Sequence, residues 1–198
     1  SSKGTPFEGH GFYEASSPRK IGSKYYFTYS SILSHELCYA VSEYPDRDYR
    51  YGGTLVSIGD VDLDGRVEPN NYTGNTHGGM VKIRDQWYIF YHRQTNKQKC
   101  ARQACAEKIT ILPDGSIPQA EITSCGLNPT PLRGHGKYEA RIACNLWAKD
   151  GKTFAYLKTF EKDKKQLHPY FTQSGADREE NGDQYIANMR DGATAGFK

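Results

Sequence analysis

Aromatic and polar residues alternate along a stretch near the start of the chain. In residues 25–31 one face of an extended chain carries Tyr25, Phe27 and Tyr29, and the other carries Tyr26, Thr28 and Ser30. An alternation of period two is typical of a β-strand with one buried face. The tetrapeptide IGSK before this stretch supplies a turn, so residues 19–31 are predicted to form a β-hairpin.

The same pattern returns 62 residues later. Aligning Lys20 with Lys82 places Tyr25 on Trp87, and a second hairpin is predicted over residues 79–93. Repeated strand-turn-strand units suggest a toroidal β-architecture whose units aim side chains at a common centre.

The rest of the chain carries shorter strand patterns separated by turns. No segment of ten or more residues keeps helical spacing, so the chain is predicted to be all-β. Apolar periodicity disappears in residues 59–75, where a long surface loop is expected. Further strands are predicted at residues 35–42, 51–58, 104–112, 117–123, 141–146, 153–160 and 184–189, with 51–58 at a sheet edge and 104–112 paired with 117–123.

Composition and charge exclude two classes of partner. The 26 basic and 23 acidic residues are interleaved, so the chain lacks the basic stripe typical of a nucleic-acid-binding protein. Its apolar runs are far shorter than the roughly 20 residues of a membrane span. We therefore expect a soluble chain that binds neither nucleic acid nor membrane. The 15 tyrosines predict an aromatic core, and aromatic rings also suit stacking on sugars.

The cysteines bear on metal binding and on the compartment. Their number is odd and their spacing irregular, which is a poor pattern for a zinc site. We expect reduced, mostly buried thiols, which favours a cytoplasmic location although the compartment itself stays open. The five are Cys38, Cys100, Cys105, Cys125 and Cys144.

The long loop contains two short motifs. Asp60, Asp62 and Asp64 form D-x-D-x-D-G, which resembles a calcium loop, but Glu68 is misplaced for the glutamate that closes an EF-hand. A calcium loop is therefore not favoured here. Asn71 begins a glycosylation sequon, with no sign of a secretory context to use it.

Glu14 and His77 are the side chains with the most distinctive surroundings. Glu14 follows Tyr13 and precedes small residues, and a carboxyl group flanked by rings and backbone is poorly solvated, so it could keep a proton and act as a general acid. A surface or capping glutamate is the alternative. His77, in N-T-H-G-G, suits a metal ligand, a polar anchor, a substrate contact or a hydrogen-bonded loop residue.

The second aromatic strand offers further candidates. Trp87 and Tyr91 could stack on a sugar, but their aromatic repeat partners favour packing inside a sheet. His92 and Arg93 end this strand and are candidate polar contacts near the predicted centre.

Several motifs together resemble a known family. The segments FYEASSPRKIGSKYYFTYSS, SHELCYAVS, NYTGNTHGGMVKIRDQWYIFYHR and ITILPDGSIPQAEITSCG occur in this order. They resemble glycoside hydrolase family 43, five-bladed β-propellers that act as β-xylosidases and α-L-arabinofuranosidases. The resemblance covers residues 7–142 and implies blades three to five of a propeller in residues 1–142. Residues 143–198 look like a linker and the start of a β-sandwich similar to carbohydrate-binding family 6.

The resemblance also implies roles for single residues. Glu14, in F-Y-E-A-S, matches the catalytic general acid of the family. His77, in N-T-H-G, matches the histidine at the propeller centre that contacts a bound ion, commonly calcium, largely through water. The implied substrates are xylo- or arabino-oligosaccharides of xylan or arabinoxylan, and the resemblance leaves the choice between xylose and arabinose open.

The inverting mechanism of the family needs a second carboxylate about 6.5 to 9.5 Å from the acid. The family's general-base Asp and a second Asp that tunes the acid belong to the first two blades, which have no counterpart here. We therefore expect a fragment that is inactive alone and whose partners are the missing blades or a second copy joined through open sheet edges. A non-catalytic carbohydrate-binding protein is the alternative function, and a structural all-β interaction domain is a third.

Overall fold

The computed structural model describes residues 2–67, 69, 74, 76–95, 98–138, 142–147, 170–171, 186–187 and 194–196. The chain divides into two compact units, one made of Ser1–Ser57, Asn75–His92 and Ala104–Glu121, the other of Ile58–Gly74, Arg93–Gln103 and Ile122–Lys198. The elements of the described residues are β-strands apart from a short 3-10 turn at Leu63–Gly65, which confirms the all-β prediction.

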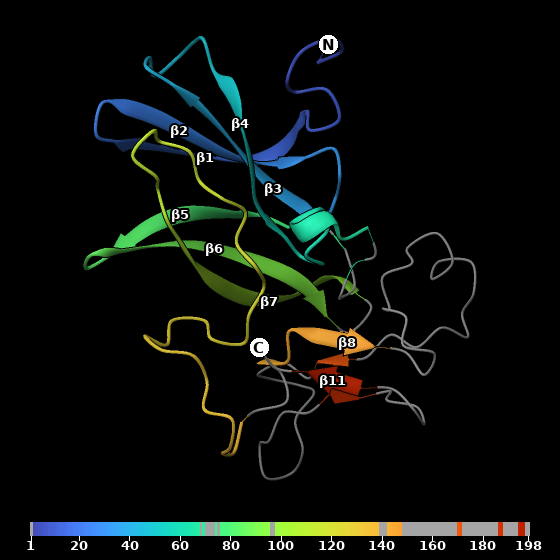
Figure 1. Ribbon diagram of the computed structural model, residues 1–198. Coiled ribbons are helices and arrows are strands. Elements are labelled where there is room, and N and C mark those ends of the chain that lie inside the picture. The colour runs from blue at the N-terminus through green and yellow to red at the C-terminus, as the bar shows by residue number, and fades with distance from the viewer. Residues whose placement is uncertain are drawn as a thin grey trace. The chain divides into compact units, whose positions relative to one another are not determined.

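The first unit contains a four-stranded antiparallel sheet in the order β1-β2-β3-β4 (Figure 1). Each strand lies beside the one that precedes it in the chain, so the sheet is a simple meander. The predicted third strand and the predicted edge strand are both confirmed. The strands are β1 (Phe12–Ile21), β2 (Lys24–Ser31), β3 (Glu36–Ser42) and β4 (Arg50–Ser57).

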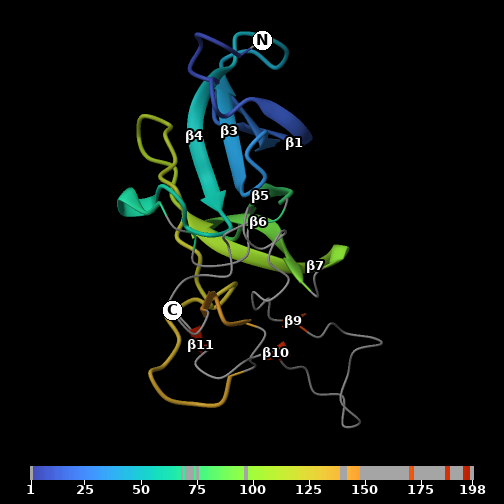
Figure 2. The same ribbon diagram turned by 90° about the vertical axis from the view of Figure 1, so that its right-hand side faces the viewer.

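A second antiparallel sheet is built from β5 (Gly78–Ile83), β6 (Gln86–Thr95) and β7 (Gln98–Ile109), which lie side by side in chain order (Figure 2). The predicted repeat is present in the strand register itself. Lys20 faces Tyr25 across the first hairpin, and Lys82 faces Trp87 across the second.

The two hairpins also turn in the same way. The first residue of each two-residue turn, Gly22 and Arg84, has a positive φ, of 60° and 54°. Tight hairpin turns need this left-handed backbone because it matches the twist of the flanking strands.

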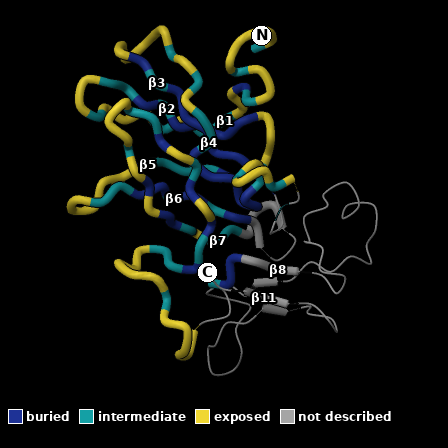
Figure 3. Tube along the Cα trace, viewed as in Figure 1, coloured by how far each residue is buried: buried dark blue, intermediate teal, exposed yellow. Residues whose placement is uncertain are grey.

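Burial concentrates on β2 and β3 (Figure 3). The rings of Tyr26 and Tyr39 stack with centroids 6.1 Å apart, and Tyr29 packs with Cys38 and Ala40. Four partly buried aromatic residues cover this cluster, which confirms an aromatic core: Phe7, Phe27, Tyr49 and Tyr51. Burial raises the pKa of the Tyr26, Tyr29 and Tyr39 hydroxyl groups above the ordinary value.

The predicted strand over residues 117–123 is wrong. This segment forms only an isolated parallel bridge, between Ala120 and Val56 of β4. Its backbone donors have other partners, because the Ile117 amide donates to the Tyr39 hydroxyl and the Ala120 amide donates to the Leu55 carbonyl. The segment therefore runs beside one end of β4 and does not pair with β7. The predicted turn at residues 113–115 is confirmed.

Two strand boundaries also differ from the predictions. The first hairpin begins at Phe12 rather than residue 19, so Glu14 lies inside β1 and not before it. The strand predicted at residues 104–112 is the last part of the longer β7.

Short strand pairs follow in the second unit. β8 (Asn145–Trp147) pairs with β11 (Thr194–Gly196), and β9 (Tyr170–Phe171) pairs with β10 (Ile186–Ala187). The predicted strand at 153–160 and the sequon at Asn71 lie outside the described residues. The β-sandwich therefore stays a prediction. Cys38, Cys105, Cys125 and Cys144 are present as thiols, and Cys100 has no described side chain. The described part of the chain contains no helix long and apolar enough to cross a membrane.

Candidate active site

Glu14 lies on an irregular part of β1. The pairing of β1 with β2 shifts register on both sides of Glu14, between Phe12 and Glu14 and between Glu14 and Ser17. The next residue, Ala15, has a φ of 61°, a left-handed conformation that is uncommon for a residue with a Cβ atom. Such bulges re-aim side chains and are frequent beside functional sites.

His77 reaches Glu14 from a segment 63 residues further along the chain. Its Nε2 atom lies 2.8 Å from Oε1 of Glu14, so one proton can be held between the imidazole and the carboxyl group. The two residues singled out from the sequence are therefore brought into direct contact. His77 directly precedes β5. The pairing of β5 with β6 therefore fixes the position of the His77 backbone.

His92 supports His77 from β6. The backbone amide of His77 donates to Nε2 of His92 at 3.1 Å, and the two imidazole rings lie 5.2 Å apart. This contact assigns the acceptor role to Nε2 of His92, which leaves the proton of a neutral ring on Nδ1. The sequence marked His92 only as a candidate polar contact, and its partner could not be read from spacing.

The residues around His77 are packed too tightly for larger side chains. A Cβ atom added at Gly78 would lie 2.0 Å from the Phe90 carbonyl oxygen, and one at Gly79 would lie 2.6 Å from the Ser17 hydroxyl. The two glycines of the N-T-H-G-G motif thus let β5 approach both β6 and β1. The buried Ser30 hydroxyl donates to the carbonyl of Thr76, which holds the residue before His77 in place.

The pair of Glu14 and His77 is open to solvent. The Glu14 side chain keeps 43% of its surface exposed and the His77 side chain 37%. The expectation that Glu14 is poorly solvated is therefore wrong for this chain, because the neighbouring Tyr13 ring is itself exposed. The opening also leaves room for a reacting molecule to approach the carboxyl group.

The described side chains alone do not form a calcium shell at this site, and a calcium ion contacted largely through water stays a prediction. Calcium takes six to eight oxygen ligands, whereas Glu14 here faces an imidazole nitrogen. Among the described side chains, no third His, Cys, Asp or Glu joins this pair to form a metal-binding group. The Asp60 carboxylate accepts the Ile122 amide at 2.8 Å, and the three aspartates of the D-x-D-x-D-G motif do not converge either.

Two of the other candidates from the second aromatic strand, Tyr91 and Arg93, are buried. Tyr91 is buried, and its hydroxyl donates to the buried Glu107 carboxylate at 3.1 Å, which confirms packing inside the sheet. Trp87 is half-buried. Arg93 is buried within the second unit, where it donates to Gln103 Oε1 and to the Ala143 carbonyl, each at 2.9 Å.

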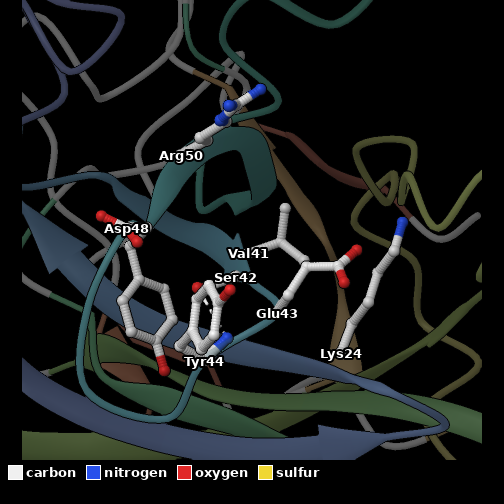
Figure 4. Close-up of a pocket in the computed structure, with 8 residues that line it drawn as sticks. Lys24, Val41, Ser42, Glu43, Tyr44, Asp48 and Arg50 are labelled. Carbon is white, nitrogen blue, oxygen red and sulfur yellow. Dashed lines mark hydrogen bonds between the residues drawn. The ribbon is translucent and has the colours of Figure 1, made fainter.

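A surface hollow of about 610 Å³ lies in the first unit, away from this chemistry (Figure 4). The side chains of Lys24, Glu43 and Asp48 are spread along it, and Tyr44 stands among them. One face of the Tyr44 ring is covered by the Arg47 guanidinium, 4.1 Å from the ring centre. Neither Glu14 nor His77 lines the hollow.

A second glutamate–histidine contact in the same unit was not predicted from the sequence. Nδ1 of His10 lies 2.8 Å from Oε2 of Glu36, and the Cys38 thiol donates to the same oxygen at 2.8 Å. The 26 residues between His10 and Glu36 carry no motif, so only the fold reveals the contact.

Comparison with known proteins gives names to relatives of the chain. Over all of its length the chain is 50% identical to a xylosidase/arabinosidase of Thermoclostridium stercorarium, of which it spans 42%. Over 42% of its length it is 37% identical to a β-xylosidase of Xylanibacter ruminicola, of which the match spans 22%. The chain thus spans less than half the length of these relatives.

Among solved structures, the chain is similar to a family 43 arabinoxylan arabinofuranohydrolase of Bacillus subtilis, with 19% identity and a TM-score of 0.49. The match covers 88% of this chain and 34% of that one. No protein-family model matches the chain.

Proposed function

We propose that this chain is part of a family 43 glycoside hydrolase that cleaves β-xylosides or α-L-arabinofuranosides. The observation that carries the proposal is the 2.8 Å contact between Glu14 and His77, each within a motif of that family. The 50% identity to a xylosidase/arabinosidase along the whole chain supports it.

Glu14 acts as the general acid. Cleavage of a glycosidic bond leaves an oxygen anion on the departing sugar unless that oxygen receives a proton as the bond breaks. The solvent-open carboxyl group of Glu14 can reach such an oxygen. A positioned general acid contributes about 10² to 10⁴ in rate.

His77 positions this acid and exchanges a proton with it. Its Nε2 atom faces Oε1 of Glu14, so the second carboxyl oxygen remains available to the substrate. The hydrogen bond from its backbone amide to His92 fixes the backbone position from which the His77 side chain extends. After the proton has moved to the leaving sugar, a hydrogen bond from His77 stabilises the carboxylate that remains.

A second carboxylate, about 6.5 to 9.5 Å from Glu14, activates the attacking water in an inverting enzyme. We assign it to a part of the protein outside this chain, in line with the expected first two blades. The meander β1–β4 and the repeated hairpins are modules from which a propeller is built, and β1–β4 has the strand number of one blade. A calcium ion near His77, held largely through water as the resemblance implies, is given no step in this mechanism.

A chimera tests the proposal. This chain replaces the matching segment of the Thermoclostridium stercorarium enzyme, to which it aligns along its whole length. We expect the chimera to hydrolyse an aryl β-xyloside or an aryl α-L-arabinofuranoside, and the chain alone to hydrolyse neither. The ratio of the two rates measures the preference between xylose and arabinose. A folded chimera that hydrolyses neither substrate would overturn the proposal.

The leaving group reveals whether Glu14 is the acid. We expect Glu14→Gln to lower the rate on xylobiose about 10² to 10⁴-fold and to spare a dinitrophenyl glycoside, whose leaving group needs no proton. Glu8→Gln is the matched control, because Glu8 is an exposed carboxylate of the same unit. Equal losses on both substrates would assign Glu14 a role other than proton donation.

The hollow beside Tyr44 favours a second candidate function, a non-catalytic carbohydrate-binding protein. In that case a chimera would bind xylo-oligosaccharides without cleaving them, and Tyr44→Ala would weaken binding while Glu14→Gln would not.

A further inference from the structure

Three side chains that commonly bind metals converge in the first unit, away from Glu14. The ligand atoms of His10, Glu36 and Cys38 all lie within 4.8 Å of one another. Glu36 and Cys38 are fully buried, and the His10 side chain keeps 29% of its surface exposed. This is the one such group among the described residues.

The three groups are held by rigid parts of the fold. Glu36 and Cys38 are two residues apart on β3 and therefore project from the same face of the strand. The loop that carries His10 is fastened to the sheet, because the Tyr29 hydroxyl donates to the His10 carbonyl at 2.7 Å. The His10 ring also stacks on Tyr51, with centroids 4.9 Å apart. The donor set is thus positioned before any ligand arrives.

We propose that His10, Glu36 and Cys38 form a zinc site. An imidazole nitrogen, a carboxylate oxygen and a thiolate sulfur are the ligand types that Zn²⁺ combines, and the soft sulfur disfavours calcium and magnesium. The carboxylate and the thiolate together carry two negative charges, which balance one Zn²⁺ ion. The proposal does not depend on the glycosidase assignment.

In the structure, hydrogen bonds join His10 and Cys38 to Glu36, and the zinc ion would replace the protons of these bonds. Glu36 Oε2 lies 2.8 Å from both His10 Nδ1 and Cys38 Sγ, which are hydrogen-bond distances. A tetrahedral zinc ion separates its ligand atoms by roughly 3.5 Å. Oε2 of Glu36 therefore needs to move away from each of the other two atoms by less than about 1 Å, and the thiol proton leaves as the metal binds. Water can complete the shell from the exposed side of His10.

Zinc would fasten the segment before β1 to the middle of the sheet. His10 lies four residues before Glu14, whereas Glu36 and Cys38 belong to the buried strand β3. The ion would thus tie the entry to β1 to the core. Its effect is expected on the stability of this entry and not on the chemical step.

Cobalt substitution tests the site on the full chain. After treatment with a chelator, the chain is titrated with Co²⁺ and, separately, with Zn²⁺. We expect one equivalent of Co²⁺ to produce the near-ultraviolet thiolate-to-cobalt charge-transfer band, and one equivalent of Zn²⁺ to abolish it and to raise the melting temperature. The absence of a one-equivalent band would overturn the proposal.

Variants assign the ligands. Cys38→Ser is expected to remove the band, whereas Cys105→Ser, at a half-buried thiol of the same unit, keeps it. His10→Ala changes a part-exposed loop residue and is the variant that tests the site if Cys38→Ser does not fold. It is expected to weaken Co²⁺ binding at least tenfold. A band that survives in Cys38→Ser, or that disappears only in Cys105→Ser, would place the metal elsewhere and overturn the assignment.

Discussion

Two glutamate–histidine contacts in the first unit have the same length and opposite surroundings. Both join a ring nitrogen to a carboxylate oxygen at 2.8 Å. In one, Glu14 and His77 keep 43% and 37% of their side-chain surface exposed. In the other, Glu36 is 1% exposed and His10 29%. The two pairs are therefore distinguished by their burial and not by their distance.

The surroundings decide what each carboxylate can do. A buried carboxylate needs permanent partners, since losing them leaves an uncompensated charge away from water. Glu36 has two such partners on one oxygen, His10 and Cys38. Glu14 can exchange partners because its side chain is open to water. The backbone differs too, because Ala15 beside Glu14 is left-handed, whereas no residue of β3 has a positive φ.

The largest expected difference is in activity. In the chimera, Glu14→Gln should lower the rate on xylobiose about 10² to 10⁴-fold, because the amide cannot deliver a proton. Glu36→Gln has a similar shape and should lower it less than about tenfold once folded protein is compared, because Glu36 is buried and cannot reach a molecule in solution. Steady-state rates normalised to the folded fraction measure both. Equal losses would remove the functional distinction between the pairs.

The next difference is in stability. Here the buried pair of His10 and Glu36 is expected to matter more than the exposed pair of His77 and Glu14. His10→Ala leaves the buried Glu36 carboxylate with one partner fewer, which should cost about 1 to 3 kcal/mol of unfolding free energy. His77→Ala breaks a solvent-screened contact and should cost less than about 1 kcal/mol. Denaturant unfolding of the metal-free chain measures both values. If His77→Ala costs more, burial does not separate the two pairs.

The third difference appears at alkaline pH and concerns the tyrosine that holds His10. Burial, and then the neighbouring Cys38, raises the pKa of Tyr29, while an unfolded tyrosine ionises near pH 10. Above about pH 10 the folded chain thus binds more protons than the unfolded chain, so stability falls as pH rises, by about 1.4 kcal/mol per pH unit for each such group.

Tyr29→Phe removes one of these groups. Above about pH 10 the unfolding free energy should therefore fall less steeply, by about 1.4 kcal/mol per pH unit. At about pH 8 it should cost roughly 1 kcal/mol, because the hydrogen bond to the His10 carbonyl is lost. Tyr13→Phe, at the exposed ring beside Glu14, is the matched control. Unfolding curves at several pH values measure the slopes, and an unchanged slope in Tyr29→Phe would contradict the account.

Local patterns predicted the parts of the fold that depend on local physics. The alternation in residues 25–31 and its repeat at 79–93 predicted both hairpins, because a hairpin is set by its strand period and its turn. Residues 117–123 have a strand-like pattern but are not a strand. Their amide donors pair with Tyr39 and Leu55, and such distant partners cannot be read from a local pattern.

The candidate site divides in the same way. Glu14 and His77 were found through the motifs around them, and their 2.8 Å contact became visible only in the fold. The degree of exposure of Glu14 was predicted wrongly, because the sequence shows Tyr13 next to Glu14 but not where its ring points. His10, Glu36 and Cys38 have no shared motif and come together only through the pairing of β2 with β3 and the loop before β1.

The smallest expected difference concerns the backbone beside the two carboxylates. Ala15 has a φ of 61°, where a side chain costs about 1 to 2 kcal/mol that glycine avoids. Ala15→Gly should therefore stabilise the chain by up to about 1 kcal/mol, after the larger entropy of unfolded glycine is subtracted. Ala40→Gly, at a buried position of β3 without a positive φ, should destabilise it by about 1 kcal/mol. Chemical denaturation measures the change in unfolding free energy of each variant. A loss in both variants would mean that the bend beside Glu14 is relaxed and that the two carboxylates differ only in their contact with water.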